Sequence, residues 1–415
     1  MQEEHPAHTA QTQFAVIDNC LQVGGMALTR LAQRAGSTPF YAIERALLTR
    51  RVQDLKKLMP AQLAIHYSIK ANPMPALVAH MAGLVDGFDV ASAGEMQLAL
   101  DAGMTPDNIV FSGPGKTDAE LLQALAAGVV VNIESLSEFR RLREMAGHWL
   151  YVPKISLRIN PDFALKSSGV SMSGGAKPFG IDAEQIPEVM AELHQAALQL
   201  HGLHIFAGSQ NLNAAAIIDA QTRSCELALK LARAWMRLSD QNLHRINLGG
   251  GFGIPYFPGE RPLDMVAVAA HMRICVEQLR QTLPEVRVEI ESGRYLVGEA
   301  GIYVARVIDK KISRGNCFLV SDGGMHHHLA VSGNFGQVIR KNYPVVVGNK
   351  VEPEDPKLAS VVGPLCTPLD ILADQMPLGH AEVGDLIVVF QSGAYGRSAS
   401  PNGFLSHAAP IEILV

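Results

Sequence analysis

A lysine in the first part of the chain occupies a position where a carbonyl compound could be bound. Lys70 directly follows the apolar run Leu63–Ile69, which we expect to be a buried strand. Most lysines are solvated surface residues, and that reading fits Lys70 as well. At the mouth of a barrel, however, desolvation can lower the pKa of an amine and free it for Schiff-base chemistry.

Three consecutive glycines follow another apolar run. The glycine triplet 249–251 comes after the expected strand Arg245–Leu248. Glycine lets backbone amides approach and surround an anion such as phosphate, although a simple turn explains the same residues. The next expected strand, Arg287–Ile290, leads into Glu291 and Arg294. These two residues add a carboxylate and a guanidinium that suits bidentate phosphate contact.

An aromatic residue and a hydroxyl follow a further expected strand. Phe206 ends the run Leu200–Phe206, and Ser209 comes three positions later. In a (β/α)8 barrel the carboxyl ends of all strands meet on one face. Lysine, glycine triplet, arginine, carboxylate and aromatic ring would then converge. A phosphorylated carbonyl cofactor bound as an imine needs that combination, so we expect pyridoxal phosphate.

The elements that must position these residues repeat along the chain. Eight apolar runs alternate with stretches of helical periodicity, among them Ser92–Ala102, Asp118–Ala127 and Ala214–Ser239. Buried parallel strands read as continuous apolar runs joined by crossover helices, so the pattern predicts an α/β fold with one (β/α)8 TIM barrel. An open doubly wound sheet is the alternative. The expected strands are Leu63–Ile69, Gly87–Ala91, Ile109–Ser112, Val129–Ile133, Ile155–Ile159, Leu200–Phe206, Arg245–Leu248 and Arg287–Ile290.

The pattern changes after the barrel. Helical stretches almost disappear and short β-branched runs are separated by Gly, Pro and Asn turns, which predicts an all-β C-terminal domain. We place the barrel at residues 38–294 and the β domain at 14–37 and 295–415, and expect residues 1–13 to be disordered. The β-branched runs are Ile302–Ile308, Cys317–Val320, Ser360–Val362, Leu386–Phe390 and Ile411–Val415.

Composition narrows the class of protein. The 415 residues are 48% hydrophobic, and 35 Lys+Arg against 40 Asp+Glu give a net charge of −5. This chain lacks the basic excess of a nucleic-acid-binding protein, and it has no apolar run long enough for a membrane span. Its polar start lacks the apolar core of a signal peptide, and its five scattered cysteines form no Cys-x-x-Cys pair. We therefore expect a cytoplasmic enzyme without a disulfide framework.

A series of short motifs occurs in order from about residue 14 to the C-terminus: YSIKAN, FDVASAGEM, LRINP, KPFGI, GLHIFAGSQ, NLGGGFG, ESGRYLVGEAG, SDGG, VVGPLCTPLD and SGAYG. Together they resemble the fold-type III pyridoxal-phosphate decarboxylases, which include the diaminopimelate, ornithine and arginine decarboxylases. The resemblance implies an alanine-racemase-like barrel with a C-terminal β domain. It also implies a head-to-tail homodimer whose active sites lie at the subunit interface.

The same resemblance implies roles for individual residues. Lys70 would hold the cofactor as a Schiff base, and Glu291 would pair with the pyridine nitrogen. Cys366 would reach across from the partner subunit and reprotonate the substrate Cα, and Asp322 would lie near the substrate. Residues that match the positions holding the cofactor and its phosphate are Ser209, Gly250, Gly251, Gly293, Arg294 and Tyr395, and those supporting the lysine and the ring are Asp89, Glu95 and Arg158.

Three positions depart from the family pattern. Phe206 stands where most members stack a histidine on the cofactor ring. Thr367 replaces the acidic residue that binds a distal ammonium group. The segment 330–334, Ala-Val-Ser-Gly-Asn, lacks the arginine and tyrosine with which diaminopimelate decarboxylases grip the distal end of their substrate. Because a site selects a charged group by pairing it, we expect free lysine, ornithine and diaminopimelate to be poor substrates.

The variant segments are most similar to one subgroup. It contains the decarboxylases associated with exosortase A and exopolysaccharide loci. The chain is similar too to the butirosin-pathway enzyme that decarboxylates glutamate tethered to an acyl carrier protein. A tethered substrate leaves the site through its pantetheine arm and needs no distal clamp, so a carrier-bound substrate is our main hypothesis. Adjacent histidines cannot all face one ion, so we read His326-His327-His328 as a substrate loop with no metal. We expect His326 of that loop to bind substrate. Thr367, which follows Cys366, is expected to bind substrate as well.

The predicted reaction is therefore the α-decarboxylation of an L-amino acid or amino-acid derivative, with Lys70 and Cys366 as catalytic residues. Within the same fold, diaminopimelate decarboxylation to lysine is the alternative. A racemase is a further possibility, but racemases of this type use a tyrosine base and have no need of the GPLC motif. A non-catalytic pyridoxal-phosphate-binding regulator is the alternative of another class; it could lose Lys70 or Cys366, and this chain keeps both.

Overall fold

The computed structural model describes residues 8–415 except 166–169, 336, 338–339 and 353–356. Its chain forms two compact units. The barrel unit consists of Arg51–Ile254 and Pro262–Gly293, and the β unit consists of Met1–Arg50, Pro255–Arg261 and Arg294–Val415.

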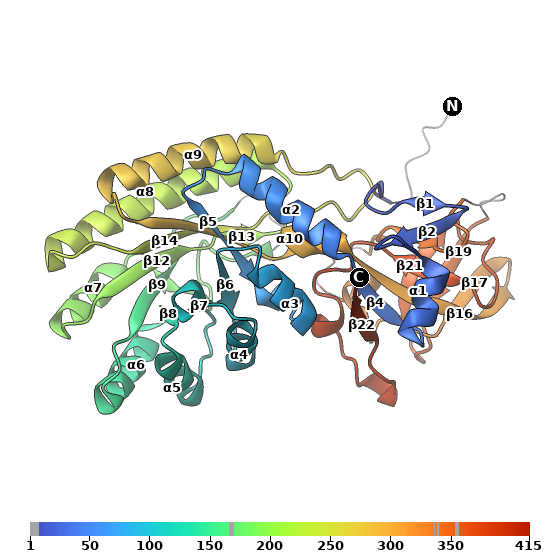
Figure 1. Ribbon diagram of the computed structural model, residues 1–415, viewed down its shortest axis with the longest axis horizontal. Coiled ribbons are helices and arrows are strands. Elements are labelled where there is room, and N and C mark those ends of the chain that lie inside the picture. The colour runs from blue at the N-terminus through green and yellow to red at the C-terminus, as the bar shows by residue number, and fades with distance from the viewer. Residues whose placement is uncertain (1–7, 166–169, 336, 338–339, 353–356) are drawn as a thin grey trace. The chain divides into compact units, whose positions relative to one another are not determined.

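Eight parallel strands close into a barrel in the barrel unit (Figure 1). Each pairs with the next in chain order, and β15 pairs with β5, as in the register Glu291 opposite His66. This closure confirms the predicted (β/α)8 barrel and rules out the open doubly wound sheet. The strands are β5 (Leu63–Ser68), β6 (Gly87–Val90), β7 (Ile109–Phe111), β8 (Val130–Ile133), β9 (Lys154–Asn160), β12 (Leu200–Ile205), β14 (Arg245–Gly250) and β15 (Arg287–Ser292).

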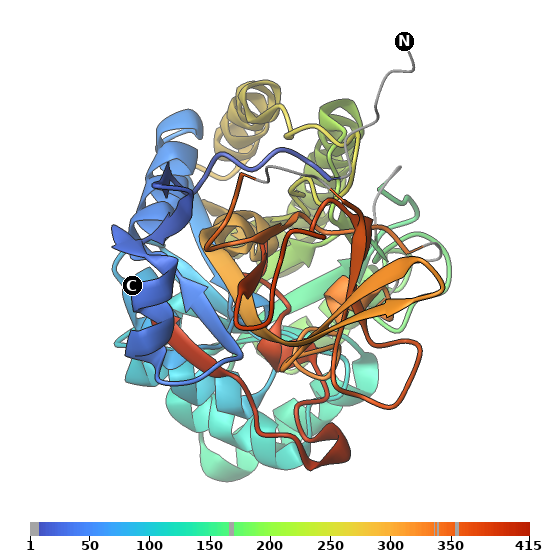
Figure 2. The same cartoon turned by 90° about the vertical axis from the view of Figure 1, so that its right-hand side faces the viewer.

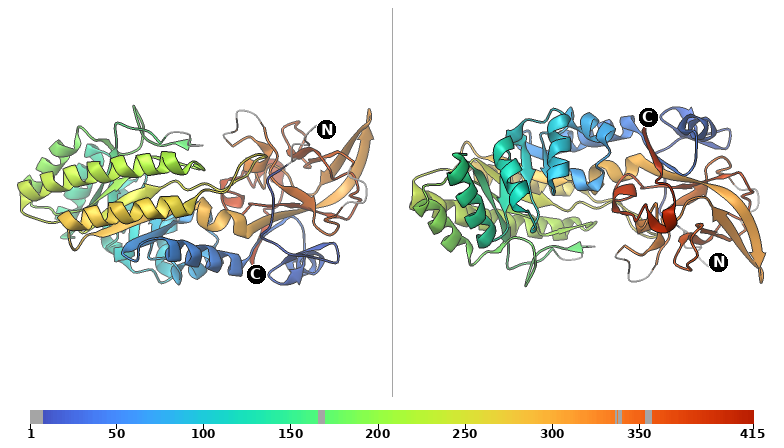
Figure 3. Two further views of the ribbon diagram at one scale, coloured as in Figure 1. Left: turned by 90° about the horizontal axis from the view of Figure 1, so that it is seen from above. Right: turned by 90° about the horizontal axis from the view of Figure 1, so that it is seen from below.

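Helices cover the outside of these strands, and their starts are encoded locally. Ser92, Thr117, Ser135 and Asn213 each accept a hydrogen bond from the backbone of the helix that follows, which satisfies an amide that the helix itself cannot pair. The two longest helices, α8 and α9, lie side by side (Figure 3). Among the described helices, none combines the length and the hydrophobicity that crossing a bilayer requires. The helices are α2 (Arg45–Leu58), α3 (Pro75–Ala82), α4 (Ala93–Asp101), α5 (Asp118–Ala127), α6 (Leu136–Trp149), α7 (Ile186–Gln195), α8 (Ala214–Ser239) and α9 (Met265–Thr282).

An ion network fills part of the barrel interior. Glu289 is fully buried and lies 2.7 Å from Arg245, 3.2 Å from Arg287 and 3.6 Å from His66. Burial on its own raises the pKa of Glu289, but His66 and the two arginines outweigh it and lower this pKa to about 2. Because a buried carboxylate without partners is very unfavourable, the two arginines allow the strand to carry a glutamate here.

Gly87, the first residue of β6, makes room for this network. A Cβ atom at Gly87 would lie 2.4 Å from the His66 ring and 2.6 Å from the carbonyl oxygen of Asn108. We therefore expect Gly87→Ala to lower the free energy of unfolding by about 1–3 kcal/mol through overpacking, measured by urea denaturation. Gly115→Ala is the matched control, because nothing lies within 4 Å of a Cβ atom at that position. Equal stability of the two variants would contradict the prediction.

The β unit contains a separate sheet with the strand order β18-β21-β16-β17-β19-β20, and β4 pairs with both β16 and β22. Figure 2 shows the long hairpin of β16 and β17 in orange. This mostly-strand unit confirms the predicted all-β domain. Its strands are β4 (Phe40–Ile43), β16 (Gly301–Ser313), β17 (Asn316–Ser321), β18 (Val345–Val347), β19 (Ala359–Val362), β20 (Ile371–Met376), β21 (Leu386–Val389) and β22 (Ile411–Leu414).

The N-terminal segment also belongs to the β unit. A small sheet of β1 (Val16–Ile17), β2 (Cys20–Val23) and β3 (Met26–Ala27) precedes helix α1 (Leu28–Ala35). The expected barrel start at residue 38 falls just before β4, a strand of the β unit, because an apolar run such as FYAI does not encode which sheet it joins. Of the segment expected to be disordered, residues 1–7 lie outside the described residues, and residues 8–13 contain no helix or strand.

Candidate active site

Lys70 lies at the carboxyl end of β5, in a short turn over Ile69–Ala71. Its Nζ is 5.9 Å from the centroid of the Phe206 ring, which follows β12. Both residues were expected at this face of the barrel, and the structure brings them together there. Because an ammonium group over an aromatic face is attracted by the ring quadrupole, Phe206 contributes to holding the lysine in place.

Three carboxylates, Asp89, Glu95 and Glu291, feel the charge of the lysine, which favours their ionised forms. Asp89 and Glu291 are buried. Burial, and then the charge of Glu291, raises the pKa of Asp89 well above its usual range. Burial also raises the pKa of Glu95. The pKa of Glu291 moves the other way, because His204 outweighs the effect of burial. Two neighbouring carboxylates with opposed pKa values are typical of a functional site.

Asp89 carries the clearest sign of a missing binding partner. Neither of its carboxylate oxygens has a hydrogen bond among the described residues, although both are buried. Buried polar atoms are normally paired. The carboxylate of Asp89 therefore fits a site that is completed by a bound polar group.

The glycine triplet adopts a backbone that other residues could not follow. Gly249 and Gly251 have φ values of +71° and +78°. A Cβ atom at Gly250 would lie 1.9 Å from the carbonyl oxygen of Glu291, and one at Gly251 would lie 2.1 Å from that of Gly208. The backbone therefore packs directly against the ends of the neighbouring strands. Ser209 lies next to this region, in the short strand β13 (Gly208–Ser209).

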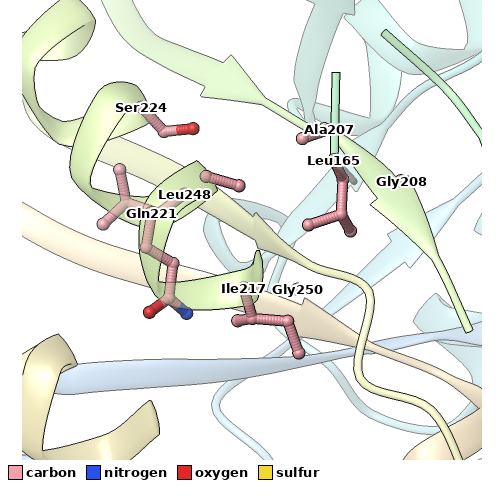
Figure 4. Close-up of a pocket in the computed structure, with 9 residues that line it drawn as sticks. Leu165, Ala207, Gly208, Ile217, Gln221, Ser224, Leu248 and Gly250 are labelled. Atoms are coloured by element: carbon pink, nitrogen blue, oxygen red, sulfur yellow. The ribbon is translucent and has the colours of Figure 1, made fainter. Parts of the chain in front are cut away.

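A small pocket lies beside the glycine triplet, between α8 and the ends of β12 and β14. Figure 4 shows Gln221 and Ser224 of α8 on one side and Leu165 with Gly208 on the other. The Oε1 atom of Gln221 has no hydrogen-bond partner among the described residues. Because no charged side chain among the described residues lines this pocket, we do not assign it to a phosphate group.

Arg158 is held by a glutamate that sequence analysis missed. Its Nη1 donates to Glu134 Oε1 at 2.9 Å, and Glu134 also accepts from the backbone amides of Gly113 and Gly180. Burial on its own raises the pKa of Glu134, but Arg158 and Lys116 outweigh it and lower this pKa. The signal was available, because Glu134 directly follows an apolar strand, as the other site residues do.

Gly293 ends the barrel unit, and its position also demands a glycine. A Cβ atom there would lie 2.8 Å from the Cβ of Ala71 and 3.4 Å from the carbonyl oxygen of Ser68. The residue is therefore packed against the turn that carries Lys70. Glycine at this position keeps that turn close to the end of β15.

In the β unit, Arg294 and Tyr395 lie together. The Arg294 guanidinium is 4.6 Å from the Tyr395 ring centroid and 5.4 Å from that of Tyr256. Its Nη1 also donates to the Tyr256 hydroxyl at 2.9 Å. Sequence analysis did not identify Tyr256 or its neighbour Tyr343, whose ring centroid is 4.6 Å away. Both are buried aromatics, and nothing in the local pattern separates them from core residues.

Asp322 and His326 occupy different environments within the β unit. Asp322 accepts hydrogen bonds from the Arg306 amide at 2.8 Å and from the Thr38 hydroxyl. His326 is buried, and neither ring nitrogen has a hydrogen bond among the described residues. Burial, followed by His327 and His407, lowers the pKa of His326 to about 3. Substrate contact by Asp322 and His326 stays a prediction.

Cys366 is exposed in the loop before β20. Thr367 follows it and is half-buried. Asp370 organises this loop, because its carboxylate accepts from the amides of Leu365 at 2.9 Å and Met325 at 2.6 Å. Asp370 thus connects the cysteine loop to the histidine loop, and sequence analysis did not single it out.

Comparisons with known proteins agree on one family. Residues 45–298 match the family described as pyridoxal-dependent decarboxylase, pyridoxal binding domain. The L-glutamyl-[BtrI acyl-carrier protein] decarboxylase of Niallia circulans is 36% identical over 393 residues, 93% of this chain and 90% of that protein. The diaminopimelate decarboxylase of Archaeoglobus fulgidus is 30% identical over 403 residues, 94% of this chain and 91% of that protein. A crystal structure of diaminopimelate decarboxylase from Helicobacter pylori complexed with L-lysine superposes with a TM-score of 0.82 at 27% identity, covering 93% of this chain and 94% of that one.

Proposed function

The chain belongs to the family of pyridoxal-dependent decarboxylases, and we propose that it removes the α-carboxylate of an amino-acyl group carried on an acyl carrier protein. The observation that carries the decarboxylase assignment is the amine of Lys70 over the Phe206 ring, in electrostatic interaction with Asp89, Glu95 and Glu291. The carrier-bound substrate is supported by the relative from Niallia circulans, whose name states such a substrate.

The residues of the barrel unit fit pyridoxal phosphate. When bound, this cofactor supplies an electron sink for the carbanion left by loss of CO₂. Lys70 would attach it covalently, and the ionised Glu291 would accept a hydrogen bond from its pyridine nitrogen. The carboxylate oxygens of Asp89, which have no hydrogen-bond partner among the described residues, could accept hydrogen bonds from the cofactor. The backbone of the glycine triplet could contact it as well. The proposal also includes a cofactor contact by Gly250 and support of the site by Arg158. The residues proposed to bind the phosphate are Ser209, Gly251, Gly293, Arg294 and Tyr395.

The proposal of a carrier-bound substrate is supported by uncharged residues at the positions expected to contact the substrate. Phe206 can stack on a ring but cannot donate a hydrogen bond or carry charge. The Thr367 hydroxyl already accepts from the Leu369 amide at 3.3 Å, and it could not pair an ammonium group as a carboxylate does. Ala330 is buried and apolar. A free diamino acid would therefore lose the pairing of its distal charge, whereas a thioester arm would not need it.

The proposal includes a homodimer with shared active sites. Cys366 is exposed in the analysed chain, and we propose that it serves the site of a second copy as the proton donor to Cα. Among the five cysteines, the other four are buried or half-buried. Their burial makes proton donation to a bound substrate implausible for them.

Intact-mass analysis tests the substrate assignment. The protein is incubated with free amino acids and with aminoacyl carrier proteins, and loss of CO₂ is followed in each. We expect carrier-bound substrate to be turned over at least about 100-fold faster than free diaminopimelate or lysine. Lys70→Ala serves as the inactive control. Turnover of free diaminopimelate at the rate of a dedicated enzyme would instead support lysine biosynthesis.

A further inference from the structure

A histidine and an asparagine cross the barrel interior to reach Glu291. His204 is on β12, Asn132 on β8 and Glu291 on β15. His204 Nε2 lies 3.2 Å from Glu291 Oε2. On its other side, His204 Nδ1 is within hydrogen-bond distance of Asn132 Nδ2, which also donates to Ser112 Oγ at 3.0 Å. The three side chains form a continuous polar chain that ends on a carboxylate of the proposed cofactor site.

The arrangement assigns the proton on the histidine ring. Asn132 is 0% exposed and His204 2% exposed, so water cannot replace the protein partners. The amide N–H of Asn132 makes Nδ1 of His204 an acceptor, which leaves the ring proton on Nε2. Nε2 lies 3.2 Å from Glu291 Oε2, so this tautomer directs its N–H group toward that carboxylate.

The carboxylate of Glu291 also has an amide neighbour. Asn247 Nδ2 is 3.5 Å from Glu291 Oε2, which is long for a hydrogen bond. The charge of Glu291 raises the pKa of Asp89, and two carboxylates in one buried site do not both ionise readily. A neighbouring group must therefore determine whether Asp89 or Glu291 carries the negative charge.

We propose that His204, held in its Nε2–H form by Asn132, is a positioning residue that keeps Glu291 ionised and aimed at the pyridine nitrogen of the cofactor. The inference rests on the proposed function. An ionised Glu291 keeps the proton on the ring nitrogen, and a protonated ring withdraws electrons better. The opposed pKa shifts of Asp89 and Glu291 agree with this division of charge. Without the donor, the proton can move from Asp89 to Glu291.

Cofactor binding to the stripped, full-length protein tests this role. Pyridoxal phosphate is compared with its 1-deaza analogue, in which carbon replaces the ring nitrogen, by absorbance titration. We expect wild type to bind pyridoxal phosphate at least about tenfold more tightly. His204→Leu should reduce that preference by about tenfold, or about 1.4 kcal/mol, by weakening pyridoxal phosphate binding and not analogue binding. His204→Gln retains an N–H donor and should keep most of the preference.

The controls separate this role from a structural one. His201→Gln is the matched control, since His201 lies on the same strand but stacks on His244 at 4.8 Å, and it should leave the preference unchanged. If His204→Leu does not fold, Asn132→Leu replaces it, and it should lower the preference by a smaller factor. Nitrogen-15 NMR of labelled histidine should report the Nε2–H form of His204 in wild type.

Each outcome decides between two claims. Equal loss of pyridoxal phosphate and analogue binding, an unchanged preference, or an Nδ1–H form of His204 would overturn the positioning role. If wild type binds neither compound, the proposed function itself fails. If wild type prefers pyridoxal phosphate and His204→Leu keeps the full preference, only the role of His204 fails.

Discussion

Lys70→Ala protein is expected to show no Schiff-base absorbance after incubation with pyridoxal phosphate, and its decarboxylation rate should fall by about 10⁴-fold or more. The physical reason is that alanine removes the amine that lies 5.9 Å above the Phe206 ring, and no other side chain supplies a nucleophile in the proposed role. The measurement is the absorbance spectrum together with single-turnover loss of CO₂.

Lys56→Ala is the control for this experiment. Lys56 is a partly exposed lysine of the barrel unit that pairs with Asp86 at 2.8 Å, and its loss should leave spectrum and rate unchanged. A Schiff-base band of unchanged intensity in Lys70→Ala would remove Lys70 from its proposed role. The protein could then not be using the amine at the end of β5.

Cys366→Ala is expected to have the second large effect. It should keep the Schiff-base band, because the cysteine does not attach the cofactor, yet lose about 10²–10⁴-fold in rate because Cα lacks its proton donor. Deuterium incorporation at Cα in D₂O should lose its stereospecificity. Cys20→Ala is the control, since Cys20 is half-buried on the small N-terminal sheet.

Mixing the two inactive variants tests whether the sites are shared. In a heterodimer of Lys70→Ala and Cys366→Ala subunits, a shared arrangement gives one site with both native residues and one with neither. Random pairing should then restore about a quarter of wild-type activity. If Cys366 serves the site of its own subunit, every site lacks one residue and mixing restores nothing.

The barrel could be predicted because each of its strands is recognisable from the local sequence alone. Each of the eight expected strands overlaps an observed one, since strands buried on both faces read as continuous apolar runs. The β unit was harder to predict. β18 is three residues long, and β20 contains Asp374 and Gln375 within an otherwise apolar run. Short or mixed strands of this kind do not differ locally from loops.

The candidate site was predicted in part, for a related reason. Lys70, Glu291 and the glycine triplet stand at strand ends, where position alone indicates a shared face. His204 and Asn132 lie inside strands, and their importance depends on which side chains meet across the barrel. One signal existed for His204: it stands two residues before Phe206, and residues two apart in an extended segment point to the same side. The partners of His204 lie on other strands across the barrel interior, so the local sequence around His204 cannot identify them.

The strand β4 has a consequence for how the chain reaches its native state. It pairs with β16, with Ile43 opposite Gly301, and in parallel with β22, with Ile43 opposite Leu414. The first pairing joins residues 43 and 301 and so closes a loop of about 258 residues. Closing a loop of this length costs conformational entropy early in folding, before the contacts between the two strands can compensate for it. During synthesis β4 leaves the ribosome long before β16 and β22. Its apolar strand edge therefore stays unpaired until those strands have been made. Completion of this sheet is therefore expected to be a late event, and a nascent chain that stalls before residue 301 presents an open strand edge on which aggregation can begin.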